Sequence, residues 1–81
     1  MDKGIRLKIR KELTTEQEKK VIQLKGTLIS GTYTDIIHIS DEGEDFYINH
    51  FVTTSEKKQQ ALEFITLYLK EKELESILWI L

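Results

Sequence analysis

The feature that most limits the fold of this chain is a faint internal repeat with a period of about 40 residues. The threonine pair Thr14–Thr15 precedes a charged, helix-like stretch and then a strand-like run over 35–39. The same succession recurs at Thr53–Thr54, with a second charged stretch and a strand-like run over 76–80. A short alternating apolar run stands before each threonine pair. The repeat therefore predicts a strand, a capped helix and a strand, twice over.

Local signals in the first half support this order of elements. Residues 4–11 alternate apolar and basic side chains, which is the period of a strand with one covered face. Thr14 or Thr15 is suited to cap the following helix, because Gln17 or Glu18 stands three residues further on and completes a capping box. We expect the first helix to begin at this point.

The segment 21–30 has two interpretations. Its apolar residues fall on one side of a helical wheel, as in a helix that packs against a core. Several of them are β-branched, so a strand over the same residues is the alternative. We favour the helix because the repeat requires it, and we expect Gly31 to form a left-handed cap at its C-terminus.

The second half predicts a hairpin followed by a helix. Two strand-like runs, 35–40 and 45–51, flank an acidic turn in which Gly43 is available for positive φ. Thr53 and Glu56 have the spacing of a capping box at the start of the second helix.

The run 76–81 completes the set of elements, because it is rich in β-branched and aromatic residues and is expected to form the last strand. Residues 1–81 are expected to form a single domain. The fold class that fits the repeat is α+β, as a ferredoxin-like βαββαβ two-layer sandwich. Such a sandwich has an antiparallel four-stranded sheet with two helices on one face.

Alternation along the strands divides the sheet residues between two faces. The side chains expected to face the helices are those of Ile5, Leu7, Ile9, Ile37, Ile39, Phe46, Ile48, Leu78 and Ile80. The other face is then expected to show Arg6, Lys8, Arg10, Ile36, His38, Tyr47, Asn49, Phe51, Ile77 and Trp79. A contiguous patch of aromatic and cationic residues is typical of an interaction surface.

This predicted surface suggests a function as a small protein-binding or regulatory module. The binding residues would be Arg6, Lys8, Arg10, His38, Tyr47, Asn49, Phe51 and Trp79, with Trp79 and Tyr47 as apolar anchors. The partner would be another protein or a second copy of the chain in a homodimer. The alternative is single-stranded nucleic acid, bound by stacking on the aromatic rings and by the basic side chains.

No pattern in the sequence predicts catalysis, so we expect that the protein is not an enzyme and uses no cofactor or metal. Cysteine is absent, which excludes disulfides and thiolate ligands. His38 and His50 are expected on opposite faces of the hairpin, where they could not share a metal ion. No secretory signal and no membrane-spanning run is visible, so we expect a cytoplasmic protein without membrane contact.

Half of the chain resembles a known family. The segments 24–27, 36–39, 47–48 and 63–65, together with Gly43, are similar to part of the small phage-encoded type II-A anti-CRISPR proteins. The resemblance implies an inhibitor from a phage or mobile element, a strand over residues 21–27, and inhibition of Cas9 by an acidic surface that mimics DNA. This chain differs in that its net charge is only −2 and its first strand is basic.

Overall fold

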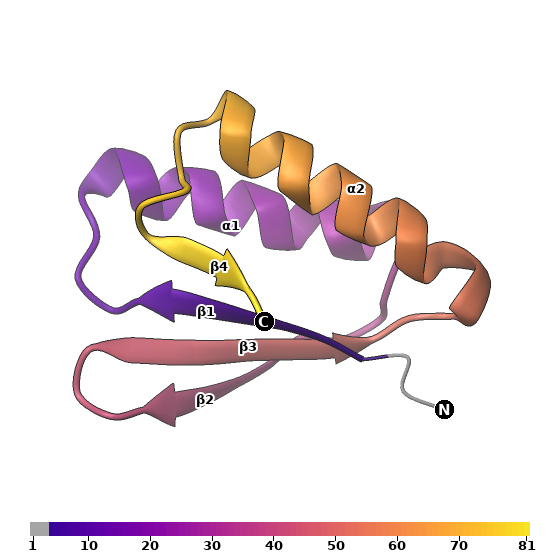
Figure 1. Ribbon diagram of the computed structural model, residues 1–81, viewed down its shortest axis with the longest axis horizontal. Helices are drawn as coiled ribbons and strands as arrows, with labels where there is room; N and C mark the ends of the chain where they lie inside the picture. The colour runs from indigo at the N-terminus through magenta and orange to yellow at the C-terminus, as the bar shows by residue number, and fades with distance from the viewer. Residues whose placement is uncertain (1–3) are drawn as a thin grey trace.

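The computed structural model describes residues 4–81, which form four strands and two helices in the order β-α-β-β-α-β (Figure 1). The elements are β1 (Gly4–Arg10), α1 (Thr15–Ser30), β2 (His38–Glu42), β3 (Phe46–Val52), α2 (Ser55–Glu71) and β4 (Leu78–Ile80). Residues 1–3 of the expected domain lie outside the described part of the chain.

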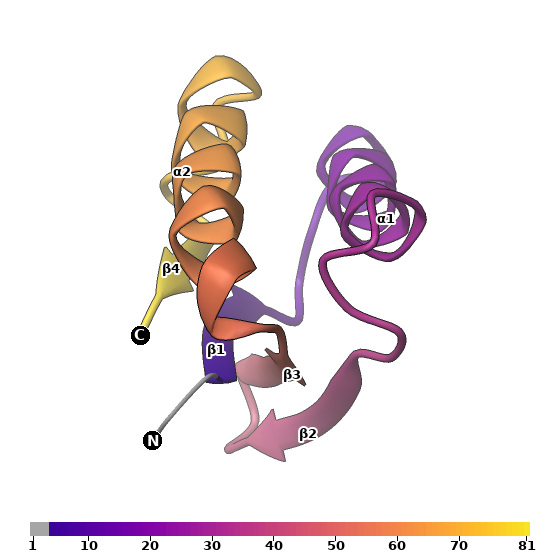
Figure 2. The same cartoon turned by 90° about the vertical axis from the view of Figure 1, so that its right-hand side faces the viewer.

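The four strands form one antiparallel sheet in the order β2-β3-β1-β4. Both helices lie on the same side of this sheet (Figure 2). In that view α2 stands above β1 and β4, whereas α1 stands on the side of β2. The expected α+β class, with an antiparallel four-stranded sheet and two helices on one face, is therefore confirmed.

The start of α1 matches the predicted capping box. The Thr14 hydroxyl accepts a hydrogen bond from the Gln17 backbone N–H at 3.1 Å, and the Gln17 side chain accepts one from the Thr14 N–H at 3.0 Å. Two of the backbone donors that a helix N-terminus leaves unpaired are satisfied in this way.

The segment 21–30 is helical, so the alternative strand is wrong, as is the strand that the family resemblance implied over 21–27. The buried residues of α1 are Val21, Leu24 and Leu28. Their spacing of three and four residues brings all three to one helix face, where they join the core. A strand would have turned Val21 and Leu24 to opposite faces.

The C-terminus of α1 differs from the prediction. Gly31 occupies the cap position with φ −80°, and the positive φ of 63° belongs to Thr32 instead. Glycine is needed at position 31 for space, because a Cβ atom there would lie 2.8 Å from the Thr27 carbonyl oxygen. The Lys57 ammonium donates hydrogen bonds to the carbonyl and hydroxyl oxygens of Thr32 and so holds this turn. In the hairpin turn, Gly43 has φ 70°, as expected.

The second helix begins one residue later than predicted. Thr54 is the N-cap, and its hydroxyl accepts from the Lys57 N–H at 3.2 Å. Thr53, the expected cap, is instead buried, and its hydroxyl has no partner among the described residues. A side chain directed into the protein cannot reach the free N–H groups at the start of α2.

The core lies between the sheet and the two helices. Its largest fully buried apolar side chains are Leu7, Leu24, Leu28, Phe51, Ile65, Leu74 and Leu78. The edge strand β2 contributes none of its residues, and Ile39, which was expected in the core, is 56% exposed. The segment that precedes β2 contributes Tyr33 and Ile37, which pack against the core while partly exposed. Ile77 was expected on the open side of the sheet, but it lies just before β4 and is buried in this core.

Candidate functional site on the open face of the sheet

Strand register decides which side chains lie on the uncovered side of the sheet. Directly paired residues of neighbouring strands project from the same face. Lys8 of β1 pairs with Ile48 of β3 and with Trp79 of β4. These pairings, extended by alternation, define the open face as Gly4, Arg6, Lys8 and Arg10 of β1, His38, Ser40 and Glu42 of β2, Phe46, Ile48, His50 and Val52 of β3, and Trp79 of β4.

Five of the eight residues expected on this face lie there. Three are the β1 cations, and the others are His38 on β2 and Trp79 on β4. The placement of β1 was predictable because its buried residues, Ile5, Leu7 and Ile9, alternate strictly with its basic ones.

The other three expected residues were placed on the wrong face. Tyr47, Asn49 and Phe51 pair with Ile9, Leu7 and Ile5, so they project toward the helices. Phe51 is completely buried and Asn49 is 1% exposed, so neither is available to a partner on the open side.

Phe46 and Ile48, which were expected in the core, lie on the open face instead. The physical reason is that β3 carries large apolar side chains at both parities, so its own alternation cannot choose a face. The choice is made by pairing with β1, and a shift of one residue exchanges every side chain between the faces.

The two histidines of the hairpin share a face, contrary to the expectation. His38 and His50 are direct partners in the β2–β3 pair, and their rings stack with centroids 5.0 Å apart and an interplanar angle of 21°. The hairpin turn contained the missing signal. Its three residues, 43–45, make Glu42 the partner of Phe46, and counting back from that pair brings the histidines together.

Two histidines alone do not make a metal site. Within residues 4–81, no group of three or more His, Cys, Asp or Glu side chains is arranged to hold a metal ion.

A shallow concavity, which we call the aromatic hollow, lies near the β4 end of the open face. It has a volume of about 340 Å³ and is lined by Lys8, Phe46, Trp79 and Leu81. The Phe46 and Trp79 rings meet edge to face, with centroids 5.9 Å apart and planes at 70°. The Lys8 ammonium lies 4.3 Å from the centroid of the Phe46 ring. Trp79 remains 38% exposed and Leu81 60% exposed, so an apolar surface is available beside a cation.

The charge of the open face is predominantly positive. Arg6, Lys8 and Arg10 follow one another along β1, and Glu42 at the far end of β2 is the acidic member of the face. Three of the four rows of paired residues on this face therefore contain one β1 cation, and the fourth pairs Gly4 with Val52. Such a surface can attract a negatively charged partner and can bury an apolar side chain in the aromatic hollow.

Comparison with models of known protein families found no match, and comparison with curated proteins found none either. Neither helix in the described part of the chain has the length and apolar character needed to cross a membrane.

Proposed function

We propose that the chain is a non-enzymatic protein-binding or regulatory module that contacts its partner through the open face. The observation that carries this proposal is the aromatic hollow, in which Trp79 and Leu81 stay exposed beside Lys8. Tryptophan is among the residue types most enriched at the energetic centre of protein interfaces. Phe46 takes the anchoring position for which Tyr47 was expected.

We also propose that the fold is ferredoxin-like. The support is the strand order, which reads 4-1-3-2 when counted from β4, together with the β-α-β-β-α-β sequence of elements. This fold carries many unrelated functions, so the proposed binding role rests on the surface and not on the fold.

The partner that fits this face is a cytoplasmic protein with an acidic surface and a protruding apolar side chain. The three cations along β1 favour acidic groups opposite them. A two-fold homodimer through the same face would bring two predominantly positive surfaces together, which is repulsive. This charge argument favours a different protein over a second copy.

Single-stranded nucleic acid is the second candidate, and the geometry of the rings favours it less. Sheet surfaces that bind RNA stack two or three bases on exposed aromatic rings. Here the Lys8 ammonium covers one side of the Phe46 ring, and the edge contact with Trp79 restricts it further. Trp79 is then the aromatic ring of the described open face best placed to stack a base.

The resemblance to phage-encoded inhibitors suggests a biological role for such a module. An inhibitor acts by covering a functional surface of its target. With a basic open face, this chain would cover an acidic surface, which differs from the DNA mimicry that the resemblance implied.

The test is selection of binders from a displayed library of random peptides, followed by affinity measurements with two matched variants. Trp79 and Tyr47 are both 38% exposed but lie on opposite faces of the sheet. We expect the selected peptides to be rich in Asp and Glu. Trp79→Ala should weaken their binding by at least about 2 kcal/mol, the usual threshold for an interface hot spot. Tyr47→Ala should leave the affinity within about threefold of the wild type.

Two results would contradict the proposal. The first is a set of binders without acidic enrichment, or with equal sensitivity to both variants. The second is tight binding of an oligothymidylate at low salt that weakens steeply as salt is added, which would favour the nucleic-acid function.

A further inference from the structure

A separate pocket lies on the helix-covered side of the sheet, between α1 and the strands β1 and β3. Its volume is about 270 Å³, just below the usual range of about 300–1,000 Å³ for ligand pockets. Ile9, Leu13 and Val21 supply apolar wall, and Lys25 and Asn49 also line the pocket. The pocket is therefore of a size for a small molecule with both apolar and polar parts.

Asn49, which lines this pocket, carries an unsatisfied polar atom. Its side chain is 1% exposed, and its oxygen Oδ1 is buried without a hydrogen-bond partner among the described residues. Buried side-chain oxygens are nearly always paired with protein or with an ordered molecule. The described part of the folded chain therefore provides no hydrogen-bond donor for this amide oxygen.

Lys25 supplies an unsatisfied charge to the same pocket. Burial lowers the pKa of its ammonium, and no other cause contributes. Within residues 4–81 it forms neither a hydrogen bond nor an ion pair. A partly buried ammonium without a counter-ion is stabilised by any anion that reaches it.

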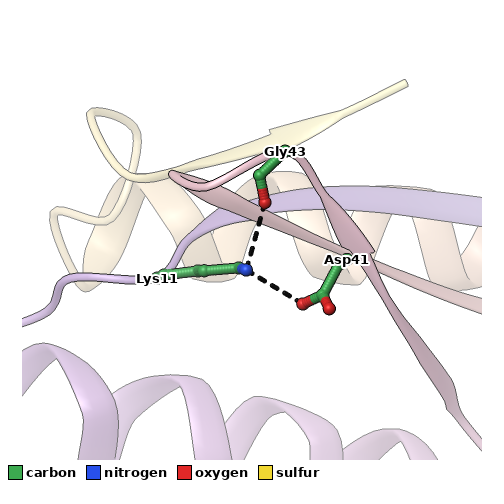
Figure 3. A network of polar contacts seen from close by, with 3 residues as sticks. All are labelled: Lys11, Asp41 and Gly43. Atoms are coloured by element: carbon green, nitrogen blue, oxygen red, sulfur yellow. Dashed lines mark hydrogen bonds and ion pairs between the residues drawn. The ribbon is translucent and has the colours of Figure 1, made fainter.

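Lys11 also lines the pocket, and its contacts with the β2–β3 hairpin hold its side chain in place. Its ammonium lies 2.9 Å from the Asp41 carboxylate and donates to the Gly43 carbonyl oxygen at 3.1 Å (Figure 3). It also lies 5.0 Å from the centroid of the Tyr47 ring. Lys11 is thus already paired. The other charged residues that line the pocket are Arg10 and Glu18, of which Glu18 is acidic.

We propose that this pocket binds a small carboxylate whose apolar body carries a hydrogen-bond donor. The donor would pair with Asn49 Oδ1, the carboxylate with the Lys25 ammonium, and the body would pack against Val21. This inference is independent of the proposed function, because the pocket and the aromatic hollow share no lining residue. Either can fail without the other.

The first experiment uses three aromatic probes that separate the two polar contacts. 4-Hydroxybenzoate has a carboxylate and a hydroxyl donor, benzoate lacks the donor, and 4-hydroxybenzamide lacks the charge. Titrations are followed by amide chemical shifts of the isotope-labelled chain. We expect 4-hydroxybenzoate to shift resonances of the pocket residues and to saturate, with at least about tenfold weaker binding of each control probe.

The second experiment uses variants at the two polar residues. Asn49→Leu removes the amide and keeps a similar volume, and Lys25→Gln removes the charge. Each should weaken 4-hydroxybenzoate by about tenfold or more. Lys19→Gln is the matched control, because Lys19 is exposed on the same helix and does not line the pocket. It should leave the affinity unchanged. The proposal is overturned by absence of saturable shifts, by equal affinity for the three probes, or by equal effects of Lys25→Gln and Lys19→Gln.

Discussion

The imidazole rings of His38 and His50 stack on the open face with centroids 5.0 Å apart, because the two residues are direct partners in the β2–β3 hairpin. Both side chains are exposed, so the contact is formed at the surface of the sheet. It joins the edge strand β2, which has no buried residue, to the central strand β3.

A double-mutant cycle measures this contact. His38→Ala and His50→Ala should each destabilise the protein, and the double variant should lose less than the sum of the two. We expect a coupling free energy of about 0.5 kcal/mol, which is typical of exposed cross-strand pairs. The measurement is the free energy of unfolding in urea for the four proteins. Additive effects would show that the rings do not interact in solution.

The adjacent residues Thr53 and Thr54, at the start of α2, should respond differently to the loss of their hydroxyl groups. Thr54→Ala removes the helix cap and should lower the free energy of unfolding by about 1 kcal/mol. Thr53→Val keeps the shape of the buried side chain and removes a hydroxyl that has no hydrogen-bond partner among the described residues. The free energy of unfolding should therefore be unchanged or higher. Urea unfolding of both variants measures these two effects. A larger loss for Thr53→Val would place the cap at the residue that the sequence predicted.

Asn49→Leu should stabilise the protein by about 1 kcal/mol. The substitution removes a buried oxygen that has no hydrogen-bond partner among the described residues, and it fills the same space with apolar atoms. Asn49→Asp, the control, places a carboxylate at the same position and should be strongly destabilising near neutral pH. Thermal and urea unfolding give the two values. A clear loss of stability in the leucine variant would indicate an ordered water or ligand on the amide.

Tyr68 ties the two helices together, and its removal should have a pH-dependent effect. The Tyr68 hydroxyl donates to the Lys20 carbonyl oxygen at 2.8 Å. Tyr68→Phe should therefore lower the free energy of unfolding by about 1 kcal/mol at neutral pH.

The sign of the pH dependence follows from burial, which raises the pKa of the Tyr68 phenol above its ordinary value of 10.0. The folded chain holds this proton more tightly than the unfolded chain. The advantage of the wild type over Tyr68→Phe is thus complete below pH 10 and is lost as the pH rises through the folded-state pKa. Urea unfolding from pH 7 to pH 11 tests this. A constant difference across that range would show that burial does not raise the pKa of Tyr68 in the folded chain.

The elements that could be predicted are those specified by local signals. The Thr14–Gln17 capping box and the spacing of Val21, Leu24 and Leu28 act within one helix, and the structure agrees with both. The β1 residues were assigned to the correct face because apolar and basic side chains alternate there without exception. In each case the physical cause lies within a few neighbouring residues.

The elements that could not be predicted depend on contacts between distant residues. Whether Phe51 or Phe46 enters the core is decided by pairing with β1, and the residues of β3 alone favour neither choice. The pocket at Asn49 escaped prediction for a related reason. A polar residue in a strand is ordinarily exposed, and only the register with Leu7 turns this one beneath α1.

The position of β1 in the sheet has a consequence for how the chain reaches its native state. It is the first strand in sequence, yet it is central, and its partners are β3 and the short C-terminal strand β4. Contacts between segments so far apart form slowly compared with helical turns. On the ribosome, Ile5, Leu7 and Ile9 would emerge before either partner strand. They would stay unpaired until Phe46–Val52 had been made, and the other edge of β1 would stay open until Leu78–Ile80 had followed. A nascent chain of this kind benefits from a chaperone or from rapid synthesis.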